Sequence, residues 1–262
     1  MDRATVLALS DLNRRFYEHH AADFRARRTH PWPGWEELLP LLEAELSASE
    51  DPTILDVGCG HGRFVTWLRE RLDRRLRSLE LDRSLALLSA VPAGELRGRC
   101  LAEATLVDGG LPIRDAGYDV VAIIGAWHHI PGLAVRRALL AACSAALRPG
   151  GLLLLSAWRF AHRRRFRARV VPWELALPGF HSRVEPGDYL LRWGDAAPDG
   201  EAGAVAEPLV RYCHHTTRRE LASSTGGLPL ELLHEFEADG DSGDLNLYQL
   251  HRRVHGPEAA PG

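Results

Sequence analysis

The sequence lacks several patterns that define protein classes. All of its 32 basic residues are arginine, and its four cysteines are widely spaced and form no CxxC pair. Such spacing argues against a disulfide framework and against a zinc site. No signal-peptide pattern opens the chain, and its longest apolar run, residues 152–158, is far too short to span a bilayer. We therefore expect a cytoplasmic protein without a membrane segment or a bound metal.

The composition is otherwise that of an ordinary globular protein. The chain has 262 residues, of which 45% are hydrophobic and 26% charged, and its formal net charge is −3. A chain of this length can bury a large core as one α/β domain. Because the net charge is close to zero, no global field draws the protein to nucleic acid or membranes, and any nucleic-acid surface must be local.

A glycine-rich turn is the most informative motif. Residues 56–62 read DVGCGHG, follow the short apolar run 53–55, and precede a segment with helical character at residues 63–72. The order of strand, glycine turn and helix is how an open α/β sheet offers backbone N–H groups to a nucleotide-like ligand. The sequence thus predicts a cofactor that contains adenosine.

The details of the turn favour one cofactor. Its glycines follow the spacing GxGxG, whereas a dinucleotide site follows GxGxxG/A and would need a small residue where this chain has Arg63. Asp56, at the end of the strand, would repel a pyrophosphate but suits an ammonium group. Both features predict S-adenosylmethionine, which carries an amino acid and a sulfonium in place of phosphates.

Acidic residues also end the next two predicted strands. Asp82 follows a strand predicted at residues 75–81, where a carboxylate can accept both ribose hydroxyls. Asp108 follows a strand predicted at residues 104–107 and is placed to hold the adenine amino group. Glu80 points to the same side of its strand as Asp82 and is an alternative for the ribose role.

Strands and helices are predicted to alternate up to residue 158. Such alternation indicates a mostly parallel sheet with helices on both faces, completed by an antiparallel closing strand. Besides the segments named above, we expect helices at residues 5–24, 35–48, 133–147 and 217–224, and strands at residues 118–124, 152–158, 230–236 and 246–252, with a turn at residues 148–151.

This pattern divides the chain into five parts. A helical N-terminal cap covers residues 1–49, and the cofactor-binding core covers residues 50–158. Residues 159–210 contain many prolines and glycines with few periodic apolar positions, so we expect an irregular insertion or lid. A closing helix and strand pair follow at residues 211–254, and residues 255–262 form a flexible tail.

As a set, these motifs resemble the class I S-adenosylmethionine-dependent methyltransferases. The resemblance is carried by DVGCGHGRF, LDRSLALL, VDGGLPIRDAGYDVV and LRPGGLLLLSAW, within residues 50–158. It implies a Rossmann-like fold and extends the cofactor site. The expected cofactor residues are Asp56, Gly58, Cys59, Gly60, Gly62, Asp82, Asp108 and Ala126.

Further segments resemble the tRNA methyltransferases that esterify 5-carboxymethyluridine at the wobble position, including the methyltransferase domain of the AlkB-homologue tRNA hydroxylase. These segments are FYEHHAADFRARRTHPWPGW, GAWHHI, VRYCHH and DLNLYQL. The resemblance implies tRNA as substrate, a small activating protein as partner, and substrate contacts from Tyr17, Arg28, Trp127, Arg211, Tyr212 and Asn246. The chain departs from the family at Cys213 in place of a tyrosine, at Leu247 in place of a tryptophan and at Arg27 in place of a threonine.

Acceptor chemistry narrows the reaction. The site after the fourth strand reads GAWHHI instead of the [DN]PPY turn of many amino-directed enzymes, and no Pro-Cys supplies a nucleophile for cytosine C5. An acceptor that is already nucleophilic remains. A carboxylate needs only alignment and exclusion of water, whereas a hydroxyl needs a general base, for which His128 and His129 are the catalytic candidates.

Several alternatives stay open at this point. The acceptor is either tRNA or a small molecule with a carboxylate or hydroxyl, and the protein is either an enzyme or a regulator that binds S-adenosylmethionine without turnover. A nucleotide enzyme of another class, such as a dehydrogenase, is disfavoured by Arg63. Six arginines within residues 159–169 are either a phosphate-binding surface or a solvated helix face.

Overall fold

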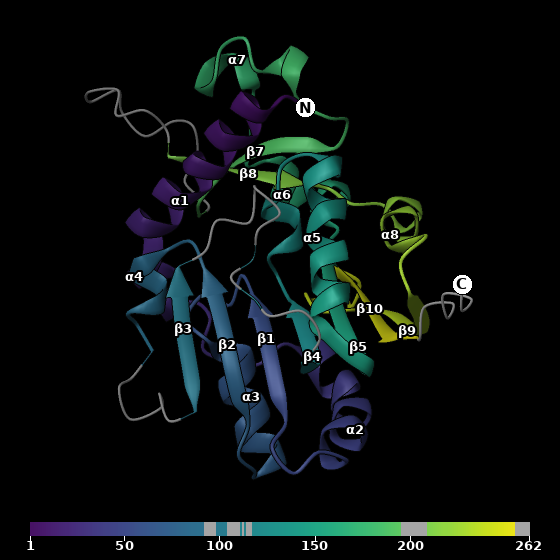
Figure 1. Ribbon diagram of the computed structural model, residues 1–262. Coiled ribbons are helices and arrows are strands. Elements are labelled where there is room, and N and C mark those ends of the chain that lie inside the picture. Colours follow the sequence, from purple (N-terminus) through teal and green to yellow (C-terminus); the bar gives the residue numbers. More distant parts are fainter. Residues whose placement is uncertain (92–97, 104–110, 112, 114–116, 195–208, 255–262) are drawn as a thin grey trace.

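A seven-stranded sheet forms the centre of the molecule in the computed structural model (Figure 1). The structure describes residues 1–262 except 92–97, 104–110, 112, 114–116, 195–208 and 255–262. The strand order is β3-β2-β1-β4-β5-β10-β9. Strands β1 to β5 run parallel, and β10 lies antiparallel between β5 and β9. The predicted fold class, mostly parallel with an antiparallel closing strand, is confirmed.

The elements of this core follow the chain in order. The helices and strands are α1 (Arg3–Ala26), α2 (Pro33–Ser47), β1 (Thr53–Val57), α3 (Arg63–Leu72), β2 (Arg77–Asp82), α4 (Leu85–Leu88), β3 (Arg99–Glu103), β4 (Tyr118–Ile123), η3 (Trp127–His129), α5 (Leu133–Ala146), β5 (Leu147–Trp158), α8 (Arg218–Thr225), β9 (Leu230–Ala238) and β10 (Asn246–Arg253).

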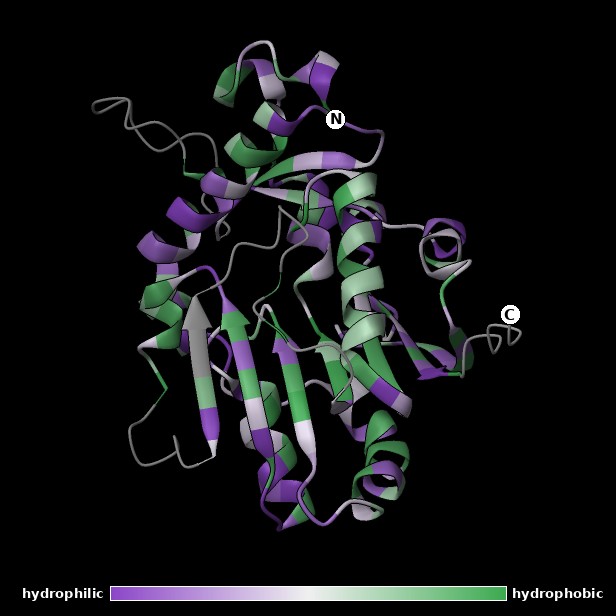
Figure 2. Cartoon of the chain, viewed as in Figure 1, coloured by the Kyte–Doolittle hydropathy of each residue, from purple (hydrophilic) through white to green (hydrophobic). Residues whose placement is uncertain are grey.

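Two apolar cores cover the two faces of the sheet. Alternate residues of one strand point to opposite faces, so Leu55 packs with α5 and α8 while its neighbour Ile54 packs with α2 and α3. The central strands are accordingly apolar along most of their length (Figure 2), as expected for strands buried on both faces. Among the described residues, no helix has both the length and the apolar character to cross a membrane.

Two predicted strands differ from the structure by more than two residues. The third strand occupies Arg99–Glu103, ahead of residues 104–107, which lie with Asp108 outside the described residues. The predicted turn at residues 148–151 lies within β5, where the register with β4 shifts. Polar residues at both ends of RCLAE and the Pro-Gly-Gly of the second segment hid their strand character.

The insertion is not irregular where the structure describes it. Residues 159–194 form η4 (Phe160–His162), α6 (Arg164–Arg167), β6 (Val170–Val171), α7 (Trp173–Ala176), η5 (His181–Arg183) and β7 (Asp188–Arg192). Strand β7 pairs with β6 and with β8 (Val210–His214), which makes a second, three-stranded sheet. Leu190 and Leu191 are both buried, in different cores. Because both faces of so short a strand are covered, no apolar alternation marks it in the sequence.

This small sheet and α1 lie together beyond the carboxyl ends of β1, β2 and β3 (Figure 1). Helix α1 packs directly on β8. Ligands of open α/β sheets bind outside the carboxyl ends of the strands, so this arrangement covers the expected site. We refer to α1 with strands β6, β7 and β8 as the cap.

Candidate functional site

The glycine turn after β1 provides room rather than hydrogen-bond donors. Gly58, Gly60 and Gly62 all have positive φ angles, of 76°, 61° and 72°, a region that L residues with a side chain rarely adopt. A Cβ on Gly58 would lie 2.2 Å from the Cβ of Ala126. The N–H groups of Gly58 and Cys59 donate to the carbonyl of Leu81. The expectation that this turn offers its N–H groups to a ligand is therefore wrong for these donors.

The third glycine faces a buried ion pair. A Cβ on Gly62 would lie 2.0 Å from Nη2 of Arg99. That guanidinium binds the fully buried carboxylate of Glu80, with 2.7 Å between Nε and Oε1. Glu80 thus neutralises Arg99, and the alternative that Glu80 competes for the ribose is wrong. Alternation along β2 predicts the side to which Glu80 points, but it does not predict that Arg99 of the neighbouring strand β3 binds it.

Asp82 is held rigidly at the end of β2. Its Oδ2 accepts the N–H of Gly60 at 2.7 Å, and its Oδ1 accepts the N–H of Ser84 at 2.9 Å. Burial raises the pKa of this carboxyl, and these hydrogen bonds oppose the rise. A third backbone N–H group, that of Arg83, also bonds this carboxylate, so its oxygens are fixed in place before any hydroxyl donor approaches.

Asp56 is the second acidic residue of the turn. It is almost fully buried, and its Oδ2 has no hydrogen-bond partner among the described residues. Burial and the neighbouring Glu80 raise the pKa of Asp56 well above its ordinary value. A buried acceptor without a partner is costly, so a donor from a bound ligand would relieve it.

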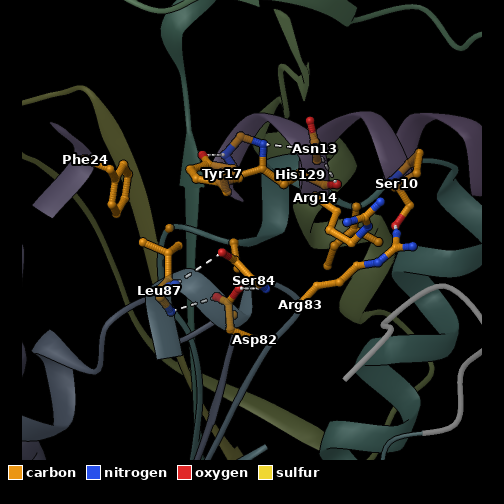
Figure 3. Close-up of a pocket in the computed structure, with 16 residues that line it drawn as sticks. Ser10, Asn13, Arg14, Tyr17, Phe24, Asp82, Arg83, Ser84, Leu87 and His129 are labelled. Atoms are coloured by element: carbon orange, nitrogen blue, oxygen red, sulfur yellow. Dashed lines mark hydrogen bonds between the residues drawn. The ribbon is translucent and has the colours of Figure 1, made fainter. Parts of the chain in front are cut away.

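The first cavity opens between the glycine turn, β2 and α1 and has a volume of about 780 Å³, open solvent at its mouth included. In Figure 3, Asp82, Ser84 and Leu87 lie on one side, and Asn13, Tyr17 and His129 lie on the other. Of the expected cofactor residues, Gly58, Gly60, Asp82 and Ala126 line this cavity, whereas Asp56, Cys59 and Gly62 do not. Asp108 lies outside the described residues.

A second, larger cavity of about 1280 Å³ adjoins the first. Four residues line both, namely Tyr17, Phe24, Gly125 and His129. Two ligands, one in each cavity, would therefore contact each other near these shared residues. The second cavity differs in chemistry, because arginines and aromatic rings make up most of its walls: Arg27, Arg28, Arg165, Arg169, Arg211, Trp32, Trp158, Phe166 and Trp193.

Arg211 is the most deeply buried of these cations. Only 5% of its surface is exposed, and its guanidinium lies over the rings of Trp158 and Trp193, at 5.2 and 5.4 Å. Nη1 donates to the hydroxyl of Tyr17 at 2.9 Å, and Nε has no partner among the described residues. No carboxylate of the described chain pairs with Arg211 or with Arg28, which lies over Trp32. Asp239 lines the same cavity and acts electrostatically on Arg28, whereas Arg211 has no carboxylate partner among the described residues. A buried guanidinium without such a partner favours an anionic ligand.

The ring of His129 is held between two groups. Its Nδ1 lies 2.9 Å from the carbonyl oxygen of Tyr212, and its Nε2 lies 2.6 Å from the hydroxyl of Tyr17. A carbonyl only accepts, so Nδ1 carries the ring proton, and Nε2 accepts from Tyr17. Burial and the charge of Arg211 lower the pKa of His129 to about 3. The ring is neutral, and its one lone pair is already used.

His128 points into the second cavity. It is buried, its Nδ1 has no partner among the described residues, and its ring lies 5.1 Å from that of Trp158. Burial, followed by the charges of His129 and Arg211, lowers the pKa of His128 well below its ordinary value. A base of such low pKa takes a proton from a hydroxyl inefficiently.

The expected substrate residues divide into two groups. Tyr17, Arg28, Arg211 and Asn246 line the second cavity, and Asn246 donates to Asp239 at 2.7 Å. Trp127 and Tyr212 line neither cavity and are fully buried. The Trp127 indole donates to the hydroxyl of Thr216 at 3.0 Å, and the Tyr212 hydroxyl donates to Asp188 at 2.6 Å. The structure therefore places these two in the core.

Other functional residues were not anticipated from the sequence. Asn13 accepts the N–H of Tyr212 and donates to the carbonyl of His129, which fixes α1 against both. Its signal was available, since Asn13 interrupts the buried helical face of Leu9 and Phe16. Trp193 and Asp239 also line the second cavity, but neither belongs to a periodic pattern.

Half of the arginines in the run at residues 159–169 form ion pairs. Arg159 pairs with Glu237, Arg163 with Asp244 and Arg165 with Asp241. Three of its six arginines therefore carry a carboxylate partner from the β9–β10 region. The run as a whole is a weaker phosphate-binding surface than its sequence indicates.

Comparison with known proteins agrees with this geometry. Residues 55–153 match the family described as "Methyltransferase domain". A curated relative, the probable tRNA methyltransferase 9B of Mus musculus, is 27% identical over 165 residues, which are 62% of this chain and 33% of the relative. The chain thus spans about a third of that relative's length. The ubiquinone biosynthesis O-methyltransferase of Idiomarina loihiensis is 33% identical over 109 residues, 39% of this chain and 41% of the relative.

Solved structures share the architecture. The Burkholderia thailandensis 1,6-didemethyltoxoflavin-N1-methyltransferase, with bound S-adenosylhomocysteine, is similar with a TM-score of 0.62 at 16% identity, over 95% of this chain and 91% of that one. Its likeness concerns the fold. Together with the glycine turn, the fixed carboxylate of Asp82 and the family match, it leads to one conclusion: the chain contains a class I S-adenosylmethionine-dependent methyltransferase domain.

Proposed function

We propose that the protein methylates a carboxylate, which it holds in the second cavity beside S-adenosylmethionine in the first. The main support for this proposal is that His129 cannot act as a base: its lone pair accepts a hydrogen bond, and its pKa is lowered to about 3. S-adenosylmethionine supplies a methyl group that a nucleophile takes in line, while the electron pair of the C–S bond remains on sulfur. An ionised carboxylate needs no proton removed, so it suits a site without a working base.

The unpaired arginines support an anionic acceptor. Nη1 of Arg211 is engaged with Tyr17, which leaves the edge formed by Nε and Nη2 for a carboxylate. This edge makes two parallel hydrogen bonds to a carboxylate. Arg28, which follows the end of α1, adds a second positive charge, and the aromatic rings around both exclude water. Such fixed alignment accounts for most of what this reaction requires.

The cofactor roles are proposals on the same footing. Asp82 would accept both ribose hydroxyls, and Gly58 with Ala126 would leave the space that the nucleoside needs. Asp56 lines neither cavity, so its contact with the ammonium group is only what the resemblance implies. Gly60 supports Asp82 through its N–H group. Cys59, Gly62 and Asp108 keep the roles that the resemblance implies for them.

The identity of the molecule that carries the methylated carboxylate is a separate part of the proposal. The similarity to a probable tRNA methyltransferase supports the carboxylate of a modified wobble uridine in tRNA. A small carboxylic acid is favoured by another observation, the ion pairing of Arg159, Arg163 and Arg165, which reduces the charge available for RNA phosphates. A regulator without turnover would transfer no methyl group to either class.

The test uses S-adenosylmethionine with a radiolabelled methyl group, offered with total tRNA or with an acidic metabolite extract. Each acceptor is used untreated and after its carboxylates have been capped as amides with carbodiimide and methylamine. We expect labelling of one acceptor pool and its loss after capping. Equal labelling of capped and untreated acceptors would refute a carboxylate acceptor. No labelling of the metabolite extract, together with no labelling of tRNA in the presence of a small activator protein, would favour the regulator.

The activating partner is tested separately. The resemblance to wobble-uridine methyltransferases implies a small activator protein, and we propose that such a partner is required only if tRNA is the acceptor. Labelling of tRNA by the purified chain alone would contradict that requirement.

A further inference from the structure

Tyr17 stands where the two cavities meet. It belongs to the four residues that line both, so its ring separates the proposed cofactor space from the proposed acceptor space. The methyl group has to travel past these shared residues. Phe24 and Gly125 offer no polar side-chain atom there, which leaves Tyr17 and His129 as the polar groups of the shared wall.

The hydrogen bonds of the Tyr17 hydroxyl can be assigned completely. A phenol oxygen has one proton to donate and two lone pairs. The guanidinium of Arg211 can only donate, so it uses one lone pair at 2.9 Å. The proton then goes to Nε2 of His129, at 2.6 Å. One lone pair is left without a partner among the described residues.

His129 is oriented so that it keeps that proton in place. Its other nitrogen is bound to the carbonyl of Tyr212, and Asn13 holds both the His129 and the Tyr212 carbonyls. The ring therefore has no freedom to exchange its donor and acceptor sides. The remaining lone pair of Tyr17 cannot be covered by its own proton, because that proton is fixed on the far side.

We propose that Tyr17 contacts the reactive methyl group, with its free lone pair directed at the polarised C–H bonds of the sulfonium methyl, and that His129 is a positioning residue for Tyr17. The proposal deepens the proposed function and rests on its assignment of the two cavities. The methyl C–H bonds next to a sulfonium carry positive charge, and C–H to oxygen contacts of this kind are weak but directional. No proton is transferred in this role.

The contact can be tested on the cofactor complex, without any acceptor. S-adenosylmethionine labelled with ¹³C in its methyl group is bound to the protein, and the proton chemical shift of that methyl group is measured. We expect a downfield shift relative to the free cofactor, most of which is lost in Tyr17→Phe. Because a weak contact is removed, the cofactor dissociation constant should change by no more than about fivefold.

A matched control is Tyr189→Phe, which removes the same hydroxyl from the cap. The ring of Tyr189 packs on Phe160 and lines neither cavity, so the methyl shift should equal that of the wild type. An unchanged methyl shift in Tyr17→Phe would overturn the proposal. A loss of cofactor affinity greater than about tenfold would also overturn it, because Tyr17 would then hold the nucleoside instead.

The role of His129 has its own pair of variants. His129→Leu removes the acceptor and frees the Tyr17 proton, so we expect the methyl shift to fall. His129→Gln offers an amide oxygen as acceptor, and we expect it to restore the shift. Equal shifts in both variants would contradict the positioning role. These measurements use only the bound cofactor, so they can fail while the carboxylate acceptor stands, and the reverse holds for the capping experiment.

Discussion

The two cavities are built by different physical means. The first is shaped by the sheet itself, since glycines without side chains make the space and the carboxylate of Asp82 is fixed by backbone N–H groups. The second is built by the cap and by the ends of β5 and β10, with long arginine side chains and aromatic rings. One cavity therefore depends on backbone geometry, and the other depends on uncompensated charge. Changes in each should affect one ligand and leave the other.

The largest expected effect separates the acceptor from the cofactor. Arg211→Met keeps an unbranched apolar stem but removes the guanidinium with its charge and hydrogen bonds. We expect methyl transfer to fall about a hundredfold or more, with cofactor affinity unchanged by calorimetry. Arg163→Met serves as the control, because Arg163 lines neither cavity and already pairs with Asp244. Comparable losses of activity in both variants would show that Arg211 has no specific role in binding the acceptor.

The converse variant is Asp82→Ala. It removes a carboxylate fixed by two backbone N–H groups, and we expect cofactor binding to weaken at least about tenfold. Asp241→Ala, at an exposed acid, should leave the calorimetric dissociation constant unchanged. An unchanged dissociation constant in Asp82→Ala would exclude this residue from the cofactor site. The first cavity would then not be assigned to the cofactor by this carboxylate.

A glycine pair measures how much the first cavity depends on space. Gly58 and Gly179 have similar φ angles, of 76° and 79°, but a Cβ would contact Ala126 at the first and nothing within 4 Å at the second. Gly179→Ala should cost about 1 kcal/mol of unfolding free energy, whereas Gly58→Ala should cost roughly 2 to 4 kcal/mol because the contact adds to the strain. Denaturant unfolding of both variants checks this, and equal costs would show that the Ala126 contact relaxes freely.

The smallest expected effect concerns the cap. His214 donates to Asp188 and Glu220, at 2.6 and 2.8 Å, next to Arg136, Glu185 and the hydroxyl of Tyr212. Burial lowers the pKa of His214, but its bonds to the two carboxylates outweigh burial, and the pKa is raised overall. Protonated His214 therefore stabilises the fold fully below about pH 6.5, and this contribution is lost as the pH rises through the folded-state pKa.

Melting temperatures between pH 6 and 9 would measure that effect. The lowered pKa values of His128 and His129 act alike in both proteins, so we expect the stability difference between the wild type and His214→Gln to shrink as the pH rises over this range. His234→Gln, at an exposed histidine paired with Glu37, should follow the wild type. A difference that grows with pH would contradict the assignment of His214 as protonated.

The contrast between the cavities also explains what the sequence could predict. Helix α3 occupies Arg63–Leu72 as predicted, because the positive φ glycines fix where it begins. Asp82 was placed correctly at a strand end, since its role depends on local order along the chain. The residues expected to bind the cofactor belong to short, contiguous sequence motifs, which is why the sequence predicts them.

The cap was harder to predict because its contacts join distant segments. Trp193 approaches Phe16 from more than 170 positions along the chain, and Arg211 meets Tyr17 across 194 positions. Trp127 was expected at the substrate because it adjoins a histidine pair, yet η3 turns it into the core while it directs His129 outward. Adjacent residues on such a turn face different environments, and sequence alone gives no direction for each.

The chemistry of the methylated product tests the central claim most directly. A carboxylate acceptor gives a methyl ester, which mild alkali hydrolyses to methanol, whereas methyl ethers and N-methyl groups resist the same treatment. We expect the radiolabel on the product to become volatile after mild alkali. Label that stays on the product would show that the acceptor is a hydroxyl or a nitrogen, and the account of a site without a general base would be contradicted.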